Sequence, residues 1–180
     1  MNFTELEIPG VILIKPDIFK DDRGYFYEAW QDKLFESAGL NYKFVKENCS
    51  GSLKGVLRGL HYQIQHSQGK LVKATNGKVF DVSVDIRKSS PTFSKWLGII
   101  LSGENKHQLW IPPGFAHGYY VMSDYAEINY KTTEYYFPEF ERTIKWDDPE
   151  INISWPLDNP PDLSEKDSEG VLLRNADLYE

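Results

Sequence analysis

Three side chains that can take part in chemistry lie close together in the middle of the chain, namely Arg58, His61 and Lys70. They occur on two apolar, strand-like runs joined by a short polar loop. A guanidinium can bind a phosphate group, a neutral imidazole can abstract a proton, and the lysine adds a second cation. Glycines beside them allow another group to approach the backbone closely. These residues therefore predict a reactive site rather than a packing contact.

The spacing of Arg58 and His61 predicts an irregular strand. Side chains three residues apart point to opposite faces of a regular strand, so the two can share a site only if the strand is distorted between them. Gly59 is the position where a bulge is expected. A lone histidine on a strand is more often a structural residue than a catalyst, and a regular ladder through Gly59 would count against a joint role.

Tyr130 is a second candidate for proton transfer. Ile128 and Thr132 lie on its own face of a predicted strand, so its side chain should point inward. One interpretation is a core tyrosine whose hydroxyl is hydrogen bonded. The second is a phenol that gives up or takes a proton.

The segment from Ser164 to Asp167 has the pattern of a helix start, with Ser164 as the N-cap and an acid three residues later. The alternative is that Asp167 fixes the tautomer of His61 and stabilises its imidazolium. Lys70 could equally be a solvated lysine on a strand with no role in chemistry. Arg23 could equally be a turn residue.

Length, charge and composition restrict the class of protein. A chain of 180 residues fits one domain. Its net charge of −7 argues against nucleic acid as a partner. A few local cations could still bind a small anion. The single cysteine, Cys49, excludes an internal disulfide framework and suits a reducing compartment. No secretory signal and no membrane-spanning apolar run are visible. We therefore expect a soluble, cytoplasmic protein with no membrane partner.

The predicted elements are mostly short strands. Residues Phe80 to Ile86 alternate between apolar and polar with a period of two, and Asn76-Gly77 between two strand-like runs predicts a two-residue hairpin. The best helix candidate is Trp30 to Ala38, ending at Gly39. This mix predicts an all-β sandwich or barrel of the jelly-roll type. We expect a single domain over 1–180, in which the tail 164–180 carries a site residue.

The spacing of Pro112, Gly114 and His117 resembles the second metal motif of the cupin superfamily. In metal-binding cupins, a pair of histidines on an earlier strand supplies further ligands, but here that strand has His61-Tyr62-Gln63. A complete centre needs three or four ligands that converge, so we expect no metal.

Taken together, these segments resemble the dTDP-4-dehydrorhamnose 3,5-epimerase family, metal-free enzymes with the cupin fold. The similarity extends from about Ile8 to Asp167, nearly the whole chain. The motifs that carry it are Asp21 to Glu28, Arg58 to Gln63, Gln68 to Val72, Phe80 to Arg87, Ser90 to Phe93, Leu109 to Pro112, Gly114 to Gly118, Trp146 to Pro149 and Ser164 to Asp167.

The resemblance implies a cupin-type jelly roll (a double-stranded β-helix barrel) with a few short peripheral helices. It also implies a homodimer that needs no cofactor. Its substrate would be dTDP-4-keto-6-deoxy-D-glucose, inverted at carbons 3 and 5. His61 would be the base, oriented by Asp167, Tyr130 would be the acid on the opposite face of the sugar, and Lys70 would stabilise the enolate. Positions that contact the ligand in the family correspond to Arg23, Phe26, Glu28, Lys46, Asn48, Arg58, His117, Tyr136, Glu141 and Lys166.

The chain departs from the family pattern at three positions. Lys46-Glu47 stands where the family usually has Gln-Asp, so Lys46 is expected either to reach a phosphate or to change the nucleotide preference. Arg142 follows Glu141 where a small residue is common. Competing interpretations are a mono-epimerase or an epimerase of another nucleotide-linked 4-keto sugar, then a sugar ketoisomerase, a metal-dependent cupin oxygenase and a non-catalytic sugar-binding jelly roll.

Overall fold

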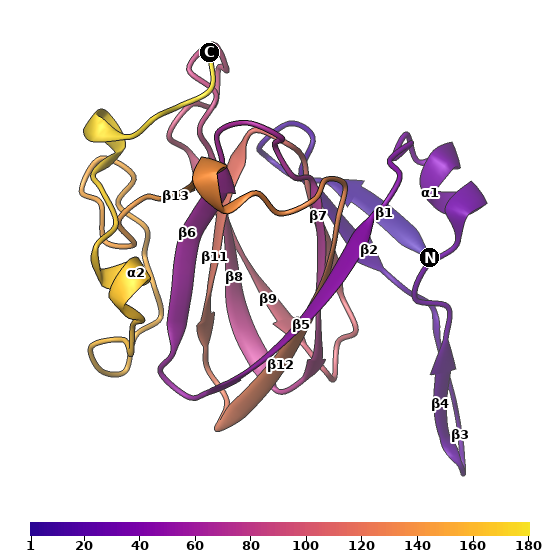
Figure 1. The fold of residues 1–180 in the computed structure, drawn as a ribbon. Coiled ribbons are helices and arrows are strands. Elements are labelled where there is room, and N and C mark those ends of the chain that lie inside the picture. Colours follow the sequence, from indigo (N-terminus) through magenta and orange to yellow (C-terminus); the bar gives the residue numbers. More distant parts are fainter.

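Two antiparallel sheets face each other and close into a barrel in the computed structural model, which describes residues 1–180 (Figure 1). The six-stranded sheet has the order β1 (Asn2–Glu5), β2 (Ile12–Lys15), β10 (Gln108–Ile111), β7 (Lys70–Asn76), β12 (Tyr125–Thr132) and β5 (Lys46–Leu53). The five-stranded sheet has the order β13 (Glu141–Thr143), β6 (Leu57–Gln63), β11 (Phe115–Val121), β8 (Lys78–Asp85) and β9 (Trp96–Ser102). The expected all-β jelly roll is confirmed.

The main hydrophobic core fills part of the space between the two sheets. Alternate residues of each strand point inward, and those of β7, β11 and β12 bring Val72, Tyr119 and Ile128 into one buried cluster. Each fully buried aliphatic side chain in this cluster, such as Val72 or Ile128, contributes about 1.5–3 kcal/mol. The core therefore holds the two sheets together around the inward-facing polar residues described below.

A second core lies outside the barrel, between the five-stranded sheet and the C-terminal segment. Val82, Val84 and Ile86 contact Ile144 and Leu173 there. The polar residues that alternate with them on β8, Asp81 and Ser83, point to the barrel interior and are also fully buried. The period of two in this strand therefore separates an apolar layer from a polar interior, and every residue from Asp81 to Ile86 is fully buried.

The hairpin predicted at Asn76-Gly77 is wrong. β7 and β8 belong to different sheets, so the turn is a corner of the barrel rather than the end of a paired ribbon. Gly77 has φ +68° and lies so close to Tyr125 that an added Cβ would be 2.0 Å from its carbonyl oxygen. The turn residues specify a tight reversal of the chain, but they do not specify which strand pairs next.

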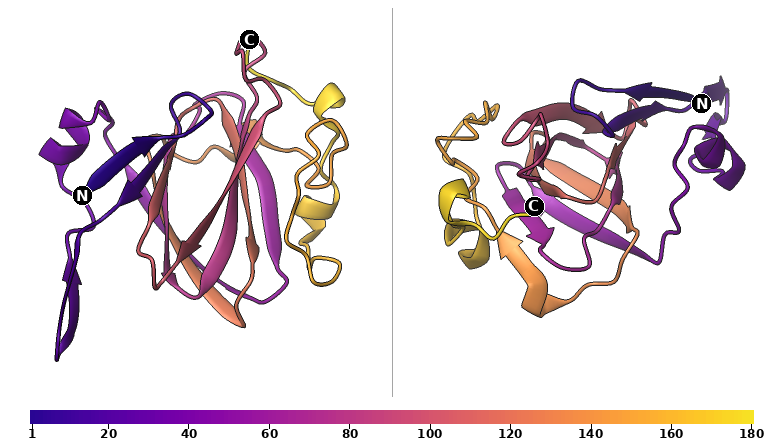
Figure 2. Two further views of the ribbon diagram at one scale, coloured as in Figure 1. Left: turned by 180° about the vertical axis from the view of Figure 1, so that it is seen from behind. Right: turned by 90° about the horizontal axis from the view of Figure 1, so that it is seen from above.

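The remaining elements lie on the outside. Helix α1 (Asp32–Ser37) is shorter than expected and buries Phe35 against the outer face of the six-stranded sheet, and Gly39 with φ +82° follows its end. The hairpin β3 (Ile18–Asp21) and β4 (Gly24–Tyr27) projects away from the barrel (Figures 1 and 2). Helix α2 (Glu165–Ser168) and two short 3-10 turns complete the fold, and none of the helices is long and apolar enough to cross a membrane.

Candidate active site

A pocket of about 330 Å³ opens between the two sheets of the barrel. Strands of both sheets contribute to it, and the polar side chains from these strands outnumber the apolar ones. Its lining residues are Lys46, Asn48, Ser50, Arg58, His61, Tyr62, Gln63, Gln68, Lys70, His117, Gly118, Tyr119, Tyr130, Tyr136, Glu141 and Lys166. Ten of the expected site residues are among them.

The predicted irregularity of β6 is confirmed. His61 pairs with His117 of β11, whereas Arg58 pairs with Tyr119, so the register shifts between the two pairs. Gly59 has φ +132°, and an added Cβ would lie 2.5 Å from the Cα of Gly118. Only glycine tolerates both this backbone conformation and this close approach. The distortion brings Arg58 and His61 into the same pocket.

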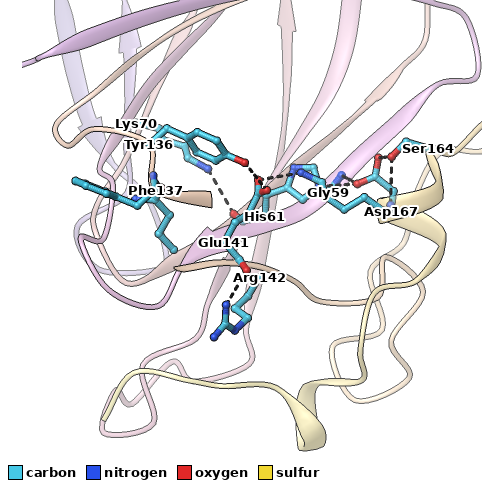
Figure 3. Close-up of polar contacts among 11 residues, drawn as sticks. Gly59, His61, Lys70, Tyr136, Phe137, Glu141, Arg142, Ser164 and Asp167 are labelled. Carbon is cyan, nitrogen blue, oxygen red and sulfur yellow. Dashed lines mark hydrogen bonds and ion pairs between the residues drawn. The ribbon is translucent and has the colours of Figure 1, made fainter. Parts of the chain in front are cut away.

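Asp167 satisfies both interpretations of its motif. Its Oδ1 lies 2.5 Å from His61 Nε2 and accepts a hydrogen bond from the Gly59 backbone N–H at 3.2 Å. Its Oδ2 accepts a hydrogen bond from the Ser164 hydroxyl at 2.7 Å, while Ser164 caps helix α2 by accepting from the Asp167 N–H. Figure 3 shows Asp167 between Ser164 and the His61 ring. The tail helix therefore delivers a carboxylate, only 2% exposed, to the histidine.

The electrostatic environment keeps His61 neutral and Asp167 ionised. Burial lowers the pKa of His61, and the nearby ammonium groups of Lys166 and Lys70 lower it further, against the opposing effect of Asp167. Burial alone would raise the pKa of Asp167, but the hydrogen bonds from His61 and Ser164 hold it at about 2. A neutral imidazole with an ionised carboxylate behind it is the state that a general base requires.

Lys70 is a buried lysine rather than a solvated one. It is 7% exposed, and its Nζ donates to the His61 backbone carbonyl at 3.4 Å across the barrel. Burial lowers its pKa to about 8, although Asp81 and Glu141 act in the opposite direction. Lys70 therefore carries a positive charge at neutral pH, in a place where few water molecules screen it.

Tyr130 points into the pocket, as its position on β12 predicted. Its neighbours on the same face, Ile128 and Thr132, are fully buried. Burial raises the pKa of the Tyr130 phenol, and Tyr119 adds to this effect. The phenol is therefore protonated at neutral pH and available as a proton donor. His61 and Tyr130 belong to different sheets, so they approach the pocket from opposite walls.

His117 forms a second pair of imidazole and carboxylate in the pocket. Its Nε2 lies 2.9 Å from Asp81 Oδ2, and both side chains are buried. The second carboxylate oxygen, Asp81 Oδ1, has no hydrogen-bond partner, nor does the Ser83 hydroxyl on the same strand. Asp81 thus fixes the orientation of the His117 ring and adds negative charge near Lys70.

Glu141 connects Tyr136 and Lys166, two other lining residues of the pocket. Its carboxylate accepts a hydrogen bond from the Tyr136 hydroxyl at 2.8 Å (Figure 3). It accepts a second from Lys166 Nζ at 2.9 Å. Lys46 lies 5.4 Å from the centroid of the Tyr136 ring, a cation–π distance. Arg142 binds Asp177 of the tail at 2.8 Å instead of lining the pocket.

Three expected ligand contacts lie outside the pocket of their own chain. Arg23 and Phe26 are on the projecting hairpin β3–β4, and Glu28 follows its second strand. The Arg23 side chain is 90% exposed and forms an ion pair with Asp21 at the tip of the hairpin. Within one chain, Arg23 is therefore a turn residue, which was its ordinary interpretation.

Several lining residues were not expected from the sequence. Ser50 and Tyr119 are joined by a hydrogen bond of 2.8 Å inside the pocket, and Gln63 and Gln68 also line it. Alternation could have found the first two, because Ser50 is two residues after Asn48 and Tyr119 is two residues after His117. Gln63 uses its amide to hold the backbone of residues 66, 135 and 137, and no spacing indicates this contact.

The site as a whole is suited to proton transfer on an anionic ligand. Four cations line it, contributed by Lys46, Arg58, Lys70 and Lys166, against the one lining carboxylate of Glu141. The pocket is therefore locally positive in a chain of net charge −7. It offers a base on one wall, a proton donor on the opposite wall, and a buried ammonium beside the base.

Comparison with known proteins agrees with this chemistry. Residues 5–175 match the family model of dTDP-4-dehydrorhamnose 3,5-epimerase. A protein of this name from Pseudomonas aeruginosa is 56% identical over 180 residues, which cover 99% of each chain. The crystal structure of a dTDP-6-deoxy-D-glucose-3,5-epimerase from Legionella pneumophila, in complex with dTDP-4-keto-L-rhamnose, is similar with a TM-score of 0.97 and 51% identity, covering 99% of this chain and 97% of that one.

A more distant match is a 3'-monoepimerase from Streptomyces bikiniensis, with a TM-score of 0.89 and 30% identity, covering 94% of this chain and 87% of that one. The fold is thus shared by enzymes that differ in the number of carbons they invert. The match to the family model over nearly the whole length, together with relatives of more than half identical sequence, settles the family. The chain belongs to the dTDP-4-dehydrorhamnose 3,5-epimerase family.

Proposed function

We propose that residues 1–180 form one catalytic domain that converts dTDP-4-keto-6-deoxy-D-glucose into dTDP-4-keto-L-rhamnose, inverting carbons 3 and 5 without a cofactor. The observation that carries this proposal is the pairing of His61 with Asp167 on one wall of the pocket and the position of Tyr130 on the opposite wall. The complex of the Legionella relative with dTDP-4-keto-L-rhamnose supports the choice of ligand.

The chemistry follows from the acidity of the sugar. A ketone at carbon 4 acidifies the protons on carbons 3 and 5, and removal of either proton gives an enolate. In this proposal neutral His61 abstracts the proton, and the protonated phenol of Tyr130 returns one to the opposite face, so the centre inverts. Negative charge develops on the ketone oxygen, where the Lys70 ammonium stabilises it.

The remaining cations account for the nucleotide part of the ligand. Arg58, Lys166 and Lys46 lie around the pocket and supply positive charge for a diphosphate. Such remote contacts hold the sugar in place during two successive inversions. Lys166 Nζ donates a hydrogen bond to Glu141, so a diphosphate that binds Lys166 competes with this carboxylate.

We further propose a homodimer in which the hairpin β3–β4 of one chain completes the pocket of its partner. Arg23 and Phe26 correspond to positions that contact the ligand in the family, but they lie outside the pocket of their own chain. The hairpin also exposes two neighbouring aromatic side chains, Phe19 at 65% and Phe26 at 69%. Paired, exposed aromatic rings of this kind mark an interaction surface. A second copy of the chain would cover them and bring Arg23 to the ligand.

We also propose a cytoplasmic location, since the exposed thiol of Cys49 is compatible with a reducing compartment.

The main competing function is inversion of a single carbon, because a 3'-monoepimerase shares the fold. A sugar ketoisomerase, a metal-dependent oxygenase and a sugar-binding protein without turnover rank behind it.

Incubation with dTDP-4-keto-6-deoxyglucose in deuterated water tests the proposal. The double epimerase incorporates deuterium at carbons 3 and 5, detected by NMR, and His61→Ala abolishes both signals. Label at one carbon alone indicates a mono-epimerase. Movement of hydrogen between carbons indicates a ketoisomerase, and metal analysis of the purified protein tests the oxygenase. Binding without any exchange contradicts an enzymatic role.

A further inference from the structure

Lys106 is a buried lysine whose ammonium contacts aromatic rings instead of a carboxylate. It lies between β9 and β10 and is 8% exposed. Its Nζ donates to the Tyr25 hydroxyl at 2.9 Å and lies 4.3 Å from the centroid of the Tyr25 ring and 5.9 Å from that of Tyr27. A buried ammonium requires compensation for lost water, which aromatic faces provide. Both rings belong to β4 of the projecting hairpin.

The turn that carries Lys106 is closed by hydrogen bonds of the Asn105 side chain. The Asn105 side chain accepts hydrogen bonds from the Ser102 and His107 backbone N–H groups and donates to the Ile100 carbonyl. Lys106 itself has φ +56°, a conformation that costs free energy for a residue that is not glycine. Such residues persist where the surroundings enforce them, often at sites that hold another group in place. These hydrogen bonds and this backbone conformation together define the turn from which Lys106 reaches the hairpin.

The hairpin has two different faces. Tyr25 and Tyr27 lie on the face that meets Lys106, with ring centroids 6.1 Å apart. Phe26 lies on the opposite face, where it pairs directly with Phe19 of β3. Tyr25 is still 58% exposed, so Lys106 holds this face by contacts to two rings rather than by a buried interface, and the two phenylalanines lie on the other face.

We propose that Lys106 is a positioning residue that fixes the orientation of the hairpin and thereby sets substrate affinity in the pocket of the partner chain. This inference rests on the proposed function, in which the hairpin completes that pocket. Gln108 provides a second anchor at the base of the hairpin, where its Nε2 donates to the Ala29 carbonyl at 2.5 Å. Lys106 is closer to the tip and controls the direction in which the tip points.

Steady-state kinetics with dTDP-4-keto-6-deoxyglucose tests the inference. Lys106→Met removes the ammonium but keeps an unbranched side chain, so we expect KM to rise about tenfold while kcat changes less than about twofold, as expected for loss of binding alone. Lys106→Arg restores the KM because a guanidinium also binds aromatic faces. Lys33→Met, an exposed lysine of α1, is the matched control and leaves both constants unchanged. An unchanged KM in Lys106→Met overturns the inference.

Tyr25→Leu provides a second approach in case Lys106→Met lowers stability. It removes the ring and hydroxyl from the hairpin side of the contact, so it raises KM similarly, and the double variant is no worse than either single variant. Additive effects of the two substitutions contradict the proposed contact.

Mixed dimers show in which chain Lys106 acts. A dimer of one Lys106→Met chain and one His61→Ala chain has one site with an intact pocket and an intact hairpin. After equal mixing and random pairing, about half of the dimers are of this mixed kind. About one quarter of all sites therefore regains the normal KM. If Lys106 acted on the pocket of its own chain, no site would regain it. Failure of the inference leaves wild-type turnover intact, whereas failure of the proposed function leaves no wild-type turnover to measure.

Discussion

Replacement of Asp167 by asparagine tests the role of the tail in catalysis. The carboxylate is 2% exposed and bonded to His61, to Ser164 and to the Gly59 N–H. Asparagine has nearly the same shape, and its amide can still contact Ser164 and His61, so the fold is retained. What is lost is the negative charge that stabilises the imidazolium after His61 takes a proton.

The magnitude follows from the strength of that contact. A hydrogen bond to a charged partner contributes about 1.5–3 kcal/mol. At about 1.4 kcal/mol per tenfold change in rate, its loss from the transition state lowers kcat by roughly 10- to 150-fold. Asp167 does not line the pocket, so KM changes by less than about twofold.

Steady-state assay of epimerisation measures both constants directly. Glu165→Gln is the matched control, because it neutralises an exposed carboxylate on the same helix that has no side-chain contact to the site. A normal kcat in Asp167→Asn would mean that Ser164 and Asp167 serve only to cap helix α2. A rise in KM with kcat unchanged would place Asp167 in ligand binding instead.

Three further predictions concern charge. The pKa of His61 is lowered from its usual value of 6.5, so the acid limb of the pH profile of kcat/KM should lie below pH 6.5. Loss of the Lys70 proton should give an alkaline limb near pH 8. Lys70→Arg should move this alkaline limb to higher pH, which a pH–rate profile measures. Burial alone would raise the pKa of Asp85, but hydrogen bonds from three neighbours hold it at about 2, below its usual 3.8. Its charge therefore stabilises the fold above pH 3.8, and this contribution is lost as the pH falls toward 2. Urea denaturation of Asp85→Asn should show an unfolding free energy lower by about 2 kcal/mol at pH 7, a difference that shrinks on acidification, whereas a constant difference would contradict the assignment. Lys46→Gln raises KM by about threefold at low salt and by less at high salt, and an effect that is independent of salt would exclude a charge contact.

The sequence predicted the inward residues of regular strands because alternation is a local property. The orientation of Tyr130 and the irregularity at Gly59 both followed from counting positions along one strand. Pairing between strands is not local, so the hairpin that Asn76-Gly77 predicts is wrong, and the turn is a corner of the barrel. Closure of the barrel depends on contacts between residues far apart in the chain.

The site was predicted in part from residue types and in part from the family resemblance. Spacing alone left Asp167 as either a cap or a partner of His61, and the structure shows that one carboxylate does both. No pattern indicated that Asp81 would be buried beside His117. The hairpin residues Arg23 and Phe26 could not be placed from one chain, because the role proposed for them depends on a second copy.

Tyr130→Phe tests whether His61 and Tyr130 transfer protons on opposite faces of the sugar. In deuterated water this variant should still exchange a proton for deuterium, because His61 can return a deuteron to the face it deprotonated. It should not invert the centre, because the donor of the opposite wall is missing. NMR distinguishes exchange from inversion at each carbon. Exchange with retention supports the role of Tyr130 as the proton donor, whereas normal inversion without the phenol would contradict it.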